Sequence, residues 1–251
     1  MCIRDRNKKD PGVARGSVPP RKVESMAVVG AGIMGAGIAA AGLKRDFLVV
    51  LKDANPDVVV SAARNIIEEV SFDRRQKKAT LERSLLYAPR LRTTSVDTEL
   101  ATCDLLIEAV VEQIDVKKQL FTQLQPLLKP DALLASNTST LPISTLALSL
   151  ARPDRFCGIH FFNPVRKMKL VEVIRGKQSS DETIAEAVAF AKRIDKVPIV
   201  VNDGPGFLVN RLLCPYLNEA LELVAQGNDI VAIDKAARSF GMPMGPIELY
   251  D

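Results

Sequence analysis

The feature that most constrains this chain is a GxGxxG run between an apolar segment and a helix-like segment. The run reads VVGAGIMGAGIA and contains Gly30, Gly32 and Gly35. Gly30 permits a tight turn, Gly32 lacks the Cβ that would block a pyrophosphate, and Gly35 lets the helix approach the strand. The N–H groups and the positive dipole end of the helix then face the phosphates. This context predicts a dinucleotide site rather than glycines that merely pack a helix on a sheet.

A carboxylate at the end of the next apolar run strengthens this prediction. Asp53 ends the run FLVVLKD, where an acidic side chain accepts hydrogen bonds from the ribose hydroxyls. The same charge repels the 2′-phosphate of NADP, and neither Lys52 nor Ala54 is an arginine that would clamp that phosphate. NAD is therefore the favoured cofactor, although the positive charge of Lys52 leaves NADP open.

Strand-like and helix-like runs alternate over most of the chain. After the glycine turn come a helix near 33–44, FLVVLKD, a charged helix beginning near Pro56, DLLIEAVV, a helix near 115–128, ALLAS, FCGIHFF, KLVEVIRG, a helix near 181–194 and VPIVV. This alternation predicts an α/β fold, namely a Rossmann-type domain with a mostly parallel sheet and crossover helices.

The pattern changes at both ends of the chain. Residues 1–25 are rich in charge, Pro and Gly, so we expect a linker or tail that packs against no core. From Gly206 onward, apolar residues at three-and-four spacing, followed by a second helix near 230–239, predict an all-helical region. The expected domains are a tail at 1–25, a NAD-binding domain at 26–204 and the truncated start of a helical domain at 205–251, with NDGP as the boundary turn.

Charge and cysteine usage indicate a soluble protein of a reducing compartment. The 251 residues include 34 Lys and Arg against 30 Asp and Glu, a net charge of +4, which is weak support for nucleic-acid binding. The four cysteines form no CxxC pair, which argues against a metal cluster or a disulfide framework. No apolar run approaches the roughly 18 residues that span a bilayer. We therefore expect a cytoplasmic protein with no metal, no nucleic-acid partner and no membrane span.

His160, the only histidine, is the candidate base for oxidation of an alcohol. Hydride transfer from a carbinol carbon requires a group that takes the hydroxyl proton, and histidine side chains change charge near neutral pH. A lone histidine is more often a core or surface residue. However, His160 lies at the end of the apolar run FCGIHFF, and ligands bind at strand ends in open α/β sheets. Asn163 and Pro164 then break the strand and supply an amide.

Glu172 is the expected partner of this histidine. It lies in KLVEVIRG, an otherwise apolar run, where a carboxylate needs a partner. If the two strands are neighbours, Glu172 accepts a hydrogen bond from the imidazole, fixes its tautomer and stabilises the imidazolium. The alternative is an exposed glutamate on an edge strand. Further polar candidates, each of which is by default a cap or turn residue, are Ser136, Asn137, Thr138, Ser139 and Asn210.

Together these motifs resemble the 3-hydroxyacyl-CoA dehydrogenase family from about Lys22 to the last residue. The matching blocks are VVGAGIMGAGIA, EAVVE, ASNTSTLPI, RFCGIHFFNPV, KLVEVIRG, PGFLVNRLLCPYLNEA and PMGPIELYD. The segment PGVARGSVPPRKV is similar to the linker between the hydratase and dehydrogenase parts of bacterial multifunctional fatty-acid oxidation proteins of the alpha-subunit type. The resemblance therefore implies a fragment that lacks a hydratase half and the rest of the helical domain.

The resemblance implies NAD-dependent oxidation of an L-3-hydroxyacyl-CoA to the 3-oxoacyl-CoA, as in fatty-acid β-oxidation. His160 would be the base and Glu172 its partner, while Ser139 and Asn210 would contact the substrate or the histidine. Gln113 departs slightly from the asparagine of many relatives. The implied partners are the acyl-CoA, a second copy of the chain or a thiolase subunit. Besides the glycines, the positions that match cofactor contacts in the family are Met34, Asp53, Val110, Val111, Glu112, Lys117, Ser139 and Asn163.

Two other functions remain open. A β-hydroxyacid dehydrogenase also begins with a glycine-rich turn and ends in helices, but such enzymes usually depend on a catalytic lysine. The HFFNP block followed by the Glu172 strand favours the hydroxyacyl-CoA substrate. The second alternative is a dinucleotide-binding protein without catalysis, or an inactive fragment of the same fold. His160 and Glu172 are both present, which argues against a protein without catalysis.

Overall fold

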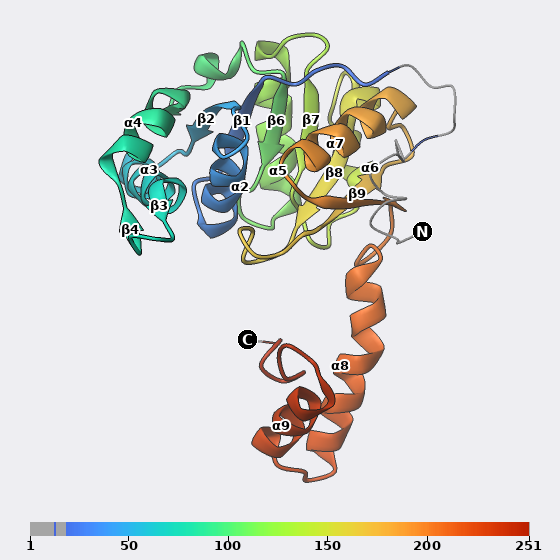
Figure 1. Cartoon of the computed structure of the whole chain (residues 1–251). Coiled ribbons are helices and arrows are strands. Elements are labelled where there is room, and N and C mark those ends of the chain that lie inside the picture. Colours follow the sequence, from blue (N-terminus) through green and yellow to red (C-terminus); the bar gives the residue numbers. More distant parts are fainter. Residues whose placement is uncertain (1–12, 14–18, 251) are drawn as a thin grey trace. The chain divides into compact units, whose positions relative to one another are not determined.

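The computed structural model describes residue 13 and residues 19–250, which divide into two compact units, one ending at Gly204 and one beginning at Pro205 (Figure 1). The second unit contains α8 (Val209–Ala225) and α9 (Ile230–Phe240). The first unit contains β1 (Ser25–Val29), α2 (Ile33–Leu43), β2 (Leu48–Lys52), α3 (Pro56–Ser71), β3 (Phe72–Asp73), β4 (Lys78–Ala79), α4 (Leu81–Tyr87), β5 (Leu91–Thr94), β6 (Leu105–Glu108), α5 (Ile114–Leu124), β7 (Leu133–Ser136), α6 (Ile143–Ala147), β8 (Phe156–Phe161), β9 (Leu170–Arg175), α7 (Asp181–Arg193) and β10 (Val197–Asn202).

Eight strands in the described part of the chain form one sheet, in the order β10-β9-β8-β7-β6-β1-β2-β5. Neighbours run parallel except β8 and β9, which pair antiparallel. The predicted mostly parallel α/β fold is thus confirmed. The chain winds from β1 outward through β2 to β5, then returns to add β6 on the other side of β1. This reversal is a topological switch point, where open α/β sheets bind ligands at the carboxyl ends of their strands.

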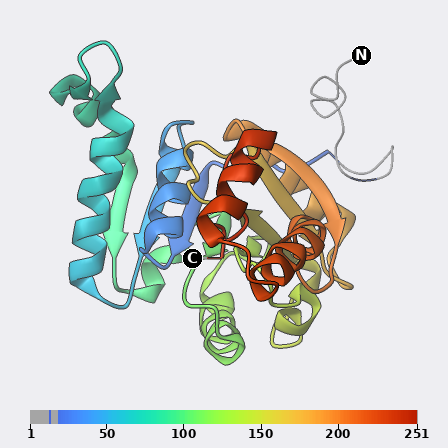
Figure 2. The ribbon, with the colours of Figure 1, turned by 90° about the horizontal axis from the view of Figure 1, so that it is seen from below.

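Helices cover both faces of this sheet, as the view in Figure 2 shows for α2 on one side and α5 on the other. Buried residues of α2, α3 and α7 belong to one hydrophobic cluster with alternate residues of the strands. On the opposite face, Phe121 of α5 packs edge-on against Phe156 of β8, with 4.9 Å between ring centroids. Alternate strand residues therefore face two separate helix layers, which explains why these strands are apolar throughout.

Local sequence explains where several helices begin and end. The Asn55 side chain caps α3 by accepting a hydrogen bond from the N–H of Asp57, and Pro56 takes the first helical position. Ser180 caps α7 in the same way. In the second unit, Asp229 caps the start of α9, and Gly241 ends this helix with a φ of 119°, which glycine adopts without strain.

Among the elements that were not predicted from the sequence are the two-residue strands β3 and β4, helix α4 and strand β5. Their apolar side chains are largely exposed, among them Phe72, Leu81 and Leu85. Strand β5 is short and reads LRTT. Without a buried face there is no apolar periodicity to detect.

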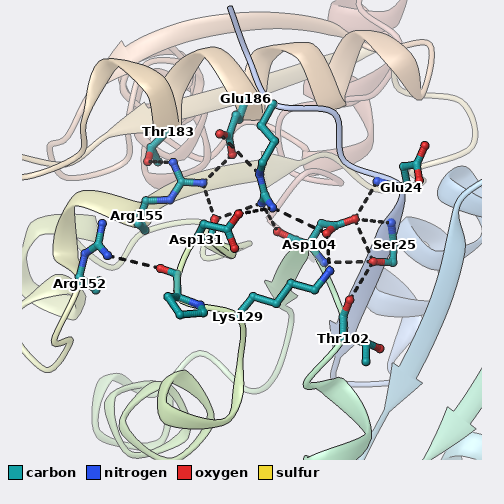
Figure 3. Close-up of polar contacts among 12 residues, drawn as sticks. Glu24, Ser25, Thr102, Asp104, Lys129, Asp131, Arg152, Arg155, Thr183 and Glu186 are labelled. Atoms are coloured by element: carbon teal, nitrogen blue, oxygen red, sulfur yellow. Dashed lines mark hydrogen bonds and ion pairs between the residues drawn. The ribbon is translucent and has the colours of Figure 1, made fainter. Parts of the chain in front are cut away.

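The amino-terminal edge of the sheet carries a network of charged side chains (Figure 3). Asp104, which precedes β6, accepts hydrogen bonds from the backbone N–H groups of Glu24 and Ser25 and pairs with Lys129 at 2.7 Å. Burial alone would raise the pKa of the Asp104 carboxyl. The Lys129 ammonium and the two N–H groups outweigh burial and hold this pKa well below its usual range.

The expected tail at 1–25 differs from the structure over its last described residues. Arg21 pairs with Asp131 at 2.8 Å and also donates to the backbone oxygen of Asp104. Val23 is buried in the hydrophobic core, and β1 begins at Ser25. The groups that bind Arg21 lie near it only after the chain has folded. The sequence alone therefore did not predict that the residues around Arg21 and Val23 pack against the domain. Residues 1–12 and 14–18 of the expected tail lie outside the described residues.

Candidate active site

The three glycines form the turn between β1 and α2. The N–H of Gly30 donates to the backbone oxygen of Lys52 at 2.8 Å, and its φ is 102°. A Cβ on Gly35 would lie 1.8 Å from the backbone oxygen of Gly30, whereas a Cβ on Gly32 would meet nothing within 4 Å. Gly32 is also the N-cap residue of α2, and no side chain in the described part of the chain accepts a hydrogen bond from the first N–H groups of this helix. The helix therefore presents its N–H groups toward an open space, which fits the pyrophosphate of a dinucleotide.

Asp53 follows β2 beside this turn. One carboxylate oxygen accepts a hydrogen bond from the N–H of Ala31 at 2.8 Å, and the other accepts one from Asn55 at 3.0 Å. Lys52 points elsewhere, since its ammonium is buried against Asp97 at 2.7 Å. With its charge neutralised by Asp97, Lys52 is not positioned to attract a 2′-phosphate, and Asp53 is the charged group next to the glycine turn. This arrangement fits NAD better than NADP.

The carboxyl end of β6 carries a buried carboxylate that sequence reasoning missed. Glu108 is fully buried, and its two oxygens accept hydrogen bonds from the Lys117 ammonium at 2.6 Å, the Val110 N–H at 2.7 Å and the Ser136 hydroxyl at 2.6 Å. The run LLIE contained the signal, because it ends in a carboxylate after three apolar residues. The same signal identified Glu172.

Glu112 joins this group from the exposed side. It lies 3.1 Å from the Lys117 ammonium and accepts hydrogen bonds from the N–H groups of Ser139 and Thr140 and from the hydroxyl of Thr138. Partial burial would raise the pKa of the Glu112 carboxyl. The Thr138 hydroxyl and the Lys117 charge outweigh burial, so this pKa lies below its usual value. The predicted cofactor residues Val110, Val111, Glu112, Lys117 and Ser139 therefore come together at the ends of β6 and β7.

His160 and Glu172 are direct neighbours on β8 and β9. The antiparallel register places the two residues opposite each other, and the imidazole Nδ1 lies 2.8 Å from a carboxylate oxygen of Glu172. His160 is 4% exposed and Glu172 is fully buried. The alternative of an exposed glutamate on an edge strand is wrong, because β10 covers that side of β9. A carboxylate only accepts hydrogen bonds, so Nδ1 carries a proton and the neutral ring has its lone pair on Nε2.

The remaining predicted residues occupy both units. The amide oxygen of Asn137 accepts a hydrogen bond from the N–H of Phe161, which ties the end of β7 to the strand that holds His160. Asn163 follows β8 and precedes Pro164 through a cis peptide bond. Met34 lies in the first turn of α2. Asn210 lies in the first turn of α8, in the second unit.

Two family models match the chain. The one described as "3-hydroxyacyl-CoA dehydrogenase, NAD binding domain" matches residues 25–204, and the one described as "3-hydroxyacyl-CoA dehydrogenase, C-terminal domain" matches residues 206–251. Among curated proteins, the chain is similar to the fatty acid oxidation complex subunit alpha of Psychrobacter sp. (strain PRwf-1), with 44% identity over 91% of the chain and 32% of that protein. The same subunit of Psychrobacter arcticus is 43% identical. The chain thus spans about a third of the curated relatives it matches.

Solved structures show the same similarity. FadB2 of M. tuberculosis has 33% identity and a TM-score of 0.85, and the match covers 91% of this chain and 82% of that one. The (S)-3-hydroxybutyryl-CoA dehydrogenase PaaH1 of Ralstonia eutropha has 37% identity and a TM-score of 0.84, with 91% and 81% covered. The 3-hydroxybutyryl-CoA dehydrogenase of Escherichia coli K12 has 36% identity and a TM-score of 0.85, with 91% and 49% covered.

Proposed function

Because the chain belongs to the 3-hydroxyacyl-CoA dehydrogenase family, we propose that it carries the NAD-dependent oxidation of an L-3-hydroxyacyl-CoA to the 3-oxoacyl-CoA in fatty-acid β-oxidation. The observation that carries this proposal is the buried pair of His160 and Glu172, 2.8 Å apart at the end of a strand in an NAD-binding sheet. The Glu172 carboxylate orients the imidazole, and Nε2 accepts the proton of the substrate hydroxyl. NAD, when bound, supplies the acceptor for the hydride.

The protein's contribution to this step is proton transfer and charge stabilisation. As the hydroxyl loses its proton, His160 becomes an imidazolium, and the buried carboxylate of Glu172 stabilises the positive charge at Nδ1. Both groups lie in a low-dielectric interior, where such an interaction is stronger than in water. In the reverse direction the imidazolium returns the proton to the oxygen of the 3-oxo group.

The proposed cofactor site lies at the switch point of the sheet, at the carboxyl ends of β1 and β6. The glycine turn of Gly30, Gly32 and Gly35 holds the pyrophosphate at the start of α2, and Asp53 binds the adenosine ribose. The other residues that we propose to hold the cofactor are Met34, Val110, Val111, Glu112, Lys117, Ser139 and Asn163. Ser139 and Asn210 are the proposed contacts to the substrate.

The experiment that tests this function compares substrates in the full-length protein. Reduction of acetoacetyl-CoA with NADH, followed at 340 nm, should be fast, and reduction of free acetoacetate should be at least about a hundredfold less efficient because the CoA part supplies binding energy. Equal efficiency with the free acid would favour a β-hydroxyacid dehydrogenase. Tight NADH binding without any turnover would instead support a dinucleotide-binding protein without catalysis.

Partners and location form part of the same proposal. The curated relatives are named as subunits of a complex, which supports assembly with a second subunit. A thiolase is the partner that we propose, since it would consume the 3-oxoacyl-CoA product. A second copy of the chain is the other proposed partner, and the location is the cytoplasm. Among the residues that the structure describes, no helix has the length and apolarity to cross a membrane.

A further inference from the structure

A buried ion pair, Glu108 with Lys117, lies within the cofactor site that we propose, and the proton transfer does not use it. We propose that Glu108 is a positioning residue of the cofactor site, which holds Lys117 and residues 110–112 in place without touching the cofactor. This inference rests on the proposed function, because it assumes that the switch point binds NAD. It concerns how the site is kept in shape, which the motif matches do not address.

Both carboxylate oxygens of Glu108 accept hydrogen bonds from donors of the protein. Its carboxylate accepts three hydrogen bonds of 2.6–2.7 Å, from the ammonium of Lys117, the backbone of Val110 and the hydroxyl of Ser136. The side chain is fully buried. A carboxylate in this position offers nothing to a ligand, and its effect on a ligand must pass through the three groups that it holds.

Lys117 is held in the same manner. Its side chain is 1% exposed, and the ammonium faces oxygens of Glu108 at 2.6 Å, of Glu112 at 3.1 Å and of the Val110 backbone at 3.5 Å. An ammonium has three protons to donate, and these three oxygens fix its position. Because Glu108 cancels the charge of Lys117, the group as a whole keeps one negative charge. That charge lies on Glu112, whose side chain is 40% exposed.

The hydrogen bonds and ion pairs of this group form a closed ring that connects the ends of β6 and β7. The Ser136 hydroxyl, bound to Glu108, also accepts the N–H of Thr138 at 3.2 Å. The Thr138 hydroxyl donates to Glu112, and Glu112 forms an ion pair with Lys117, which in turn pairs with Glu108. Next to Glu108, the backbone oxygen of Ala109 lies where a Cβ on Gly30 would come within 2.5 Å. A shift of Glu108 would therefore displace residues 109–112 against the glycine turn and loosen the turn at 138–140.

Loss of stability alone would not establish this role. Removal of one member of any buried ion pair leaves the other charge unpaired and destabilises the fold. The chain contains a matched control at the opposite edge of the sheet, where Arg155 and Glu186 form a buried pair at 2.6 Å. Figure 3 shows this pair among the residues at the amino-terminal ends of the strands. Glu186→Gln should reduce stability in the same way as Glu108→Gln, while the cofactor edge is left intact.

The experiment uses the full-length protein and four variants: Glu108→Gln, Lys117→Met, Glu108→Gln with Lys117→Met, and Glu186→Gln. Thermal unfolding reports stability, NADH fluorescence titration gives the dissociation constant, and acetoacetyl-CoA reduction gives kcat and the KM values. The double variant removes both charges, so it should regain much of the stability that each single change loses. If Glu108→Gln does not fold, the NADH affinity of the double variant is compared with that of Lys117→Met, which separates the effect of Glu108 from any contact of Lys117 with the cofactor.

We expect the dissociation constant and the KM for NADH to rise at least about tenfold in Glu108→Gln, because residues 110–112 and 138–140 are no longer held in place, as when a supporting partner of a binding residue is lost. The KM for acetoacetyl-CoA should stay within about twofold. In the double variant, stability returns but weak NADH binding persists, and Glu186→Gln binds NADH like the wild type. Wild-type NADH affinity in both Glu108→Gln and the double variant would overturn the proposal. A wild-type protein that does not bind NADH would contradict the proposed function itself, and this role with it.

Discussion

At the scale of single residues, the carboxylates of Glu172 and Asp53 have different proposed roles. Glu172 is buried with an oxygen 2.8 Å from the imidazole Nδ1 of His160 and can respond to the charge that develops there. Asp53 accepts hydrogen bonds from the backbone of Ala31 and Asn55 and lies beside the glycine turn. We therefore assign proton transfer to the β8–β9 pair and recognition of the ribose to the end of β2.

Asp53→Ala should weaken NAD binding by about ten- to a hundredfold, as the loss of charge-assisted hydrogen bonds implies. Because the charge that repels a 2′-phosphate is lost, the preference for NAD over NADP should fall as well. Dissociation constants for both cofactors measure this change. Asp53→Asn, which keeps an oxygen to accept the Ala31 N–H, serves as the control for the turn. If Asp53→Ala discriminates as well as the wild type, another residue reads the ribose.

Individual residues were predictable where a charge interrupts an apolar run. Glu172 was identified in this way, and its contact with His160 follows from the antiparallel register of β8 and β9. Glu108 shows the same pattern within DLLIEAVV but was missed, because its partner Lys117 lies on a helix and not on a neighbouring strand. The partners of Arg21 were not predicted either, because Asp104 and Asp131 are about 80 to 110 positions away in the sequence. Contacts of this kind exist only after the sheet has formed.

At the scale of elements, substitutions in the glycine turn distinguish an effect on NADH binding from an effect on the free energy of unfolding. Gly32→Ala should leave the free energy of unfolding within about 0.5 kcal/mol of the wild type, because nothing lies within 4 Å of the added Cβ. It should nevertheless weaken NADH binding more than tenfold by crowding the pyrophosphate. Gly35→Ala should cost about 1–3 kcal/mol, because its Cβ would meet the Gly30 backbone oxygen at 1.8 Å. Unimpaired NADH binding by Gly32→Ala would place the pyrophosphate elsewhere.

At the other edge of the sheet, Asp104 should make stability depend on pH. Its folded pKa is depressed relative to an unfolded value of about 3.9. Its stabilising effect is therefore complete above this unfolded pKa and is lost as the pH falls through the folded pKa. Asp104→Asn should lower the free energy of unfolding by about 2 kcal/mol at pH 7, with a smaller difference below about pH 4. A difference that stays constant between pH 7 and pH 3, in urea unfolding, would contradict this account.

The long elements were predictable because their periodicity reflects burial. The strands β1, β2, β6, β7, β8, β9 and β10 and the helices α2, α3, α5 and α7 each bury a face against the sheet. The ends of α8 and α9 also follow from the sequence, through Gly206, Asp229 and Gly241. Strand β5 and helix α4 expose most of their side chains, and only tertiary contacts reveal them.

At the scale of the whole molecule, two buried thiols report on the integrity of the sheet unit. Burial raises the pKa of the Cys103 thiol to about 11 and that of Cys157 to about 12. Cys214 is an exposed thiol in the second unit. In native protein at pH 8, iodoacetamide should modify Cys214 within minutes and should leave Cys103 and Cys157 unmodified until the sheet unfolds. Peptide mass spectrometry after pulse labelling measures this, and rapid native labelling of Cys157 would contradict the buried position of β8.

In the molecule as a whole, one sheet carries the dinucleotide turn at the end of β1 and the proposed base near the end of β8. The family determines the chemistry, and the geometry of His160 and Glu172 explains how this chain would perform it. The proposed proton transfer depends on this one pair. The central claim is therefore that His160 is the base.

The direct test is the single-turnover rate of acetoacetyl-CoA reduction by NADH in the full-length protein, compared between the wild type and His160→Gln. NADH affinity, measured in parallel by fluorescence, controls for folding and cofactor binding. We predict normal affinity and a rate that falls by about two to four powers of ten, the usual contribution of a positioned acid or base. A variant that reduces acetoacetyl-CoA at a rate within about threefold of the wild type would contradict the account.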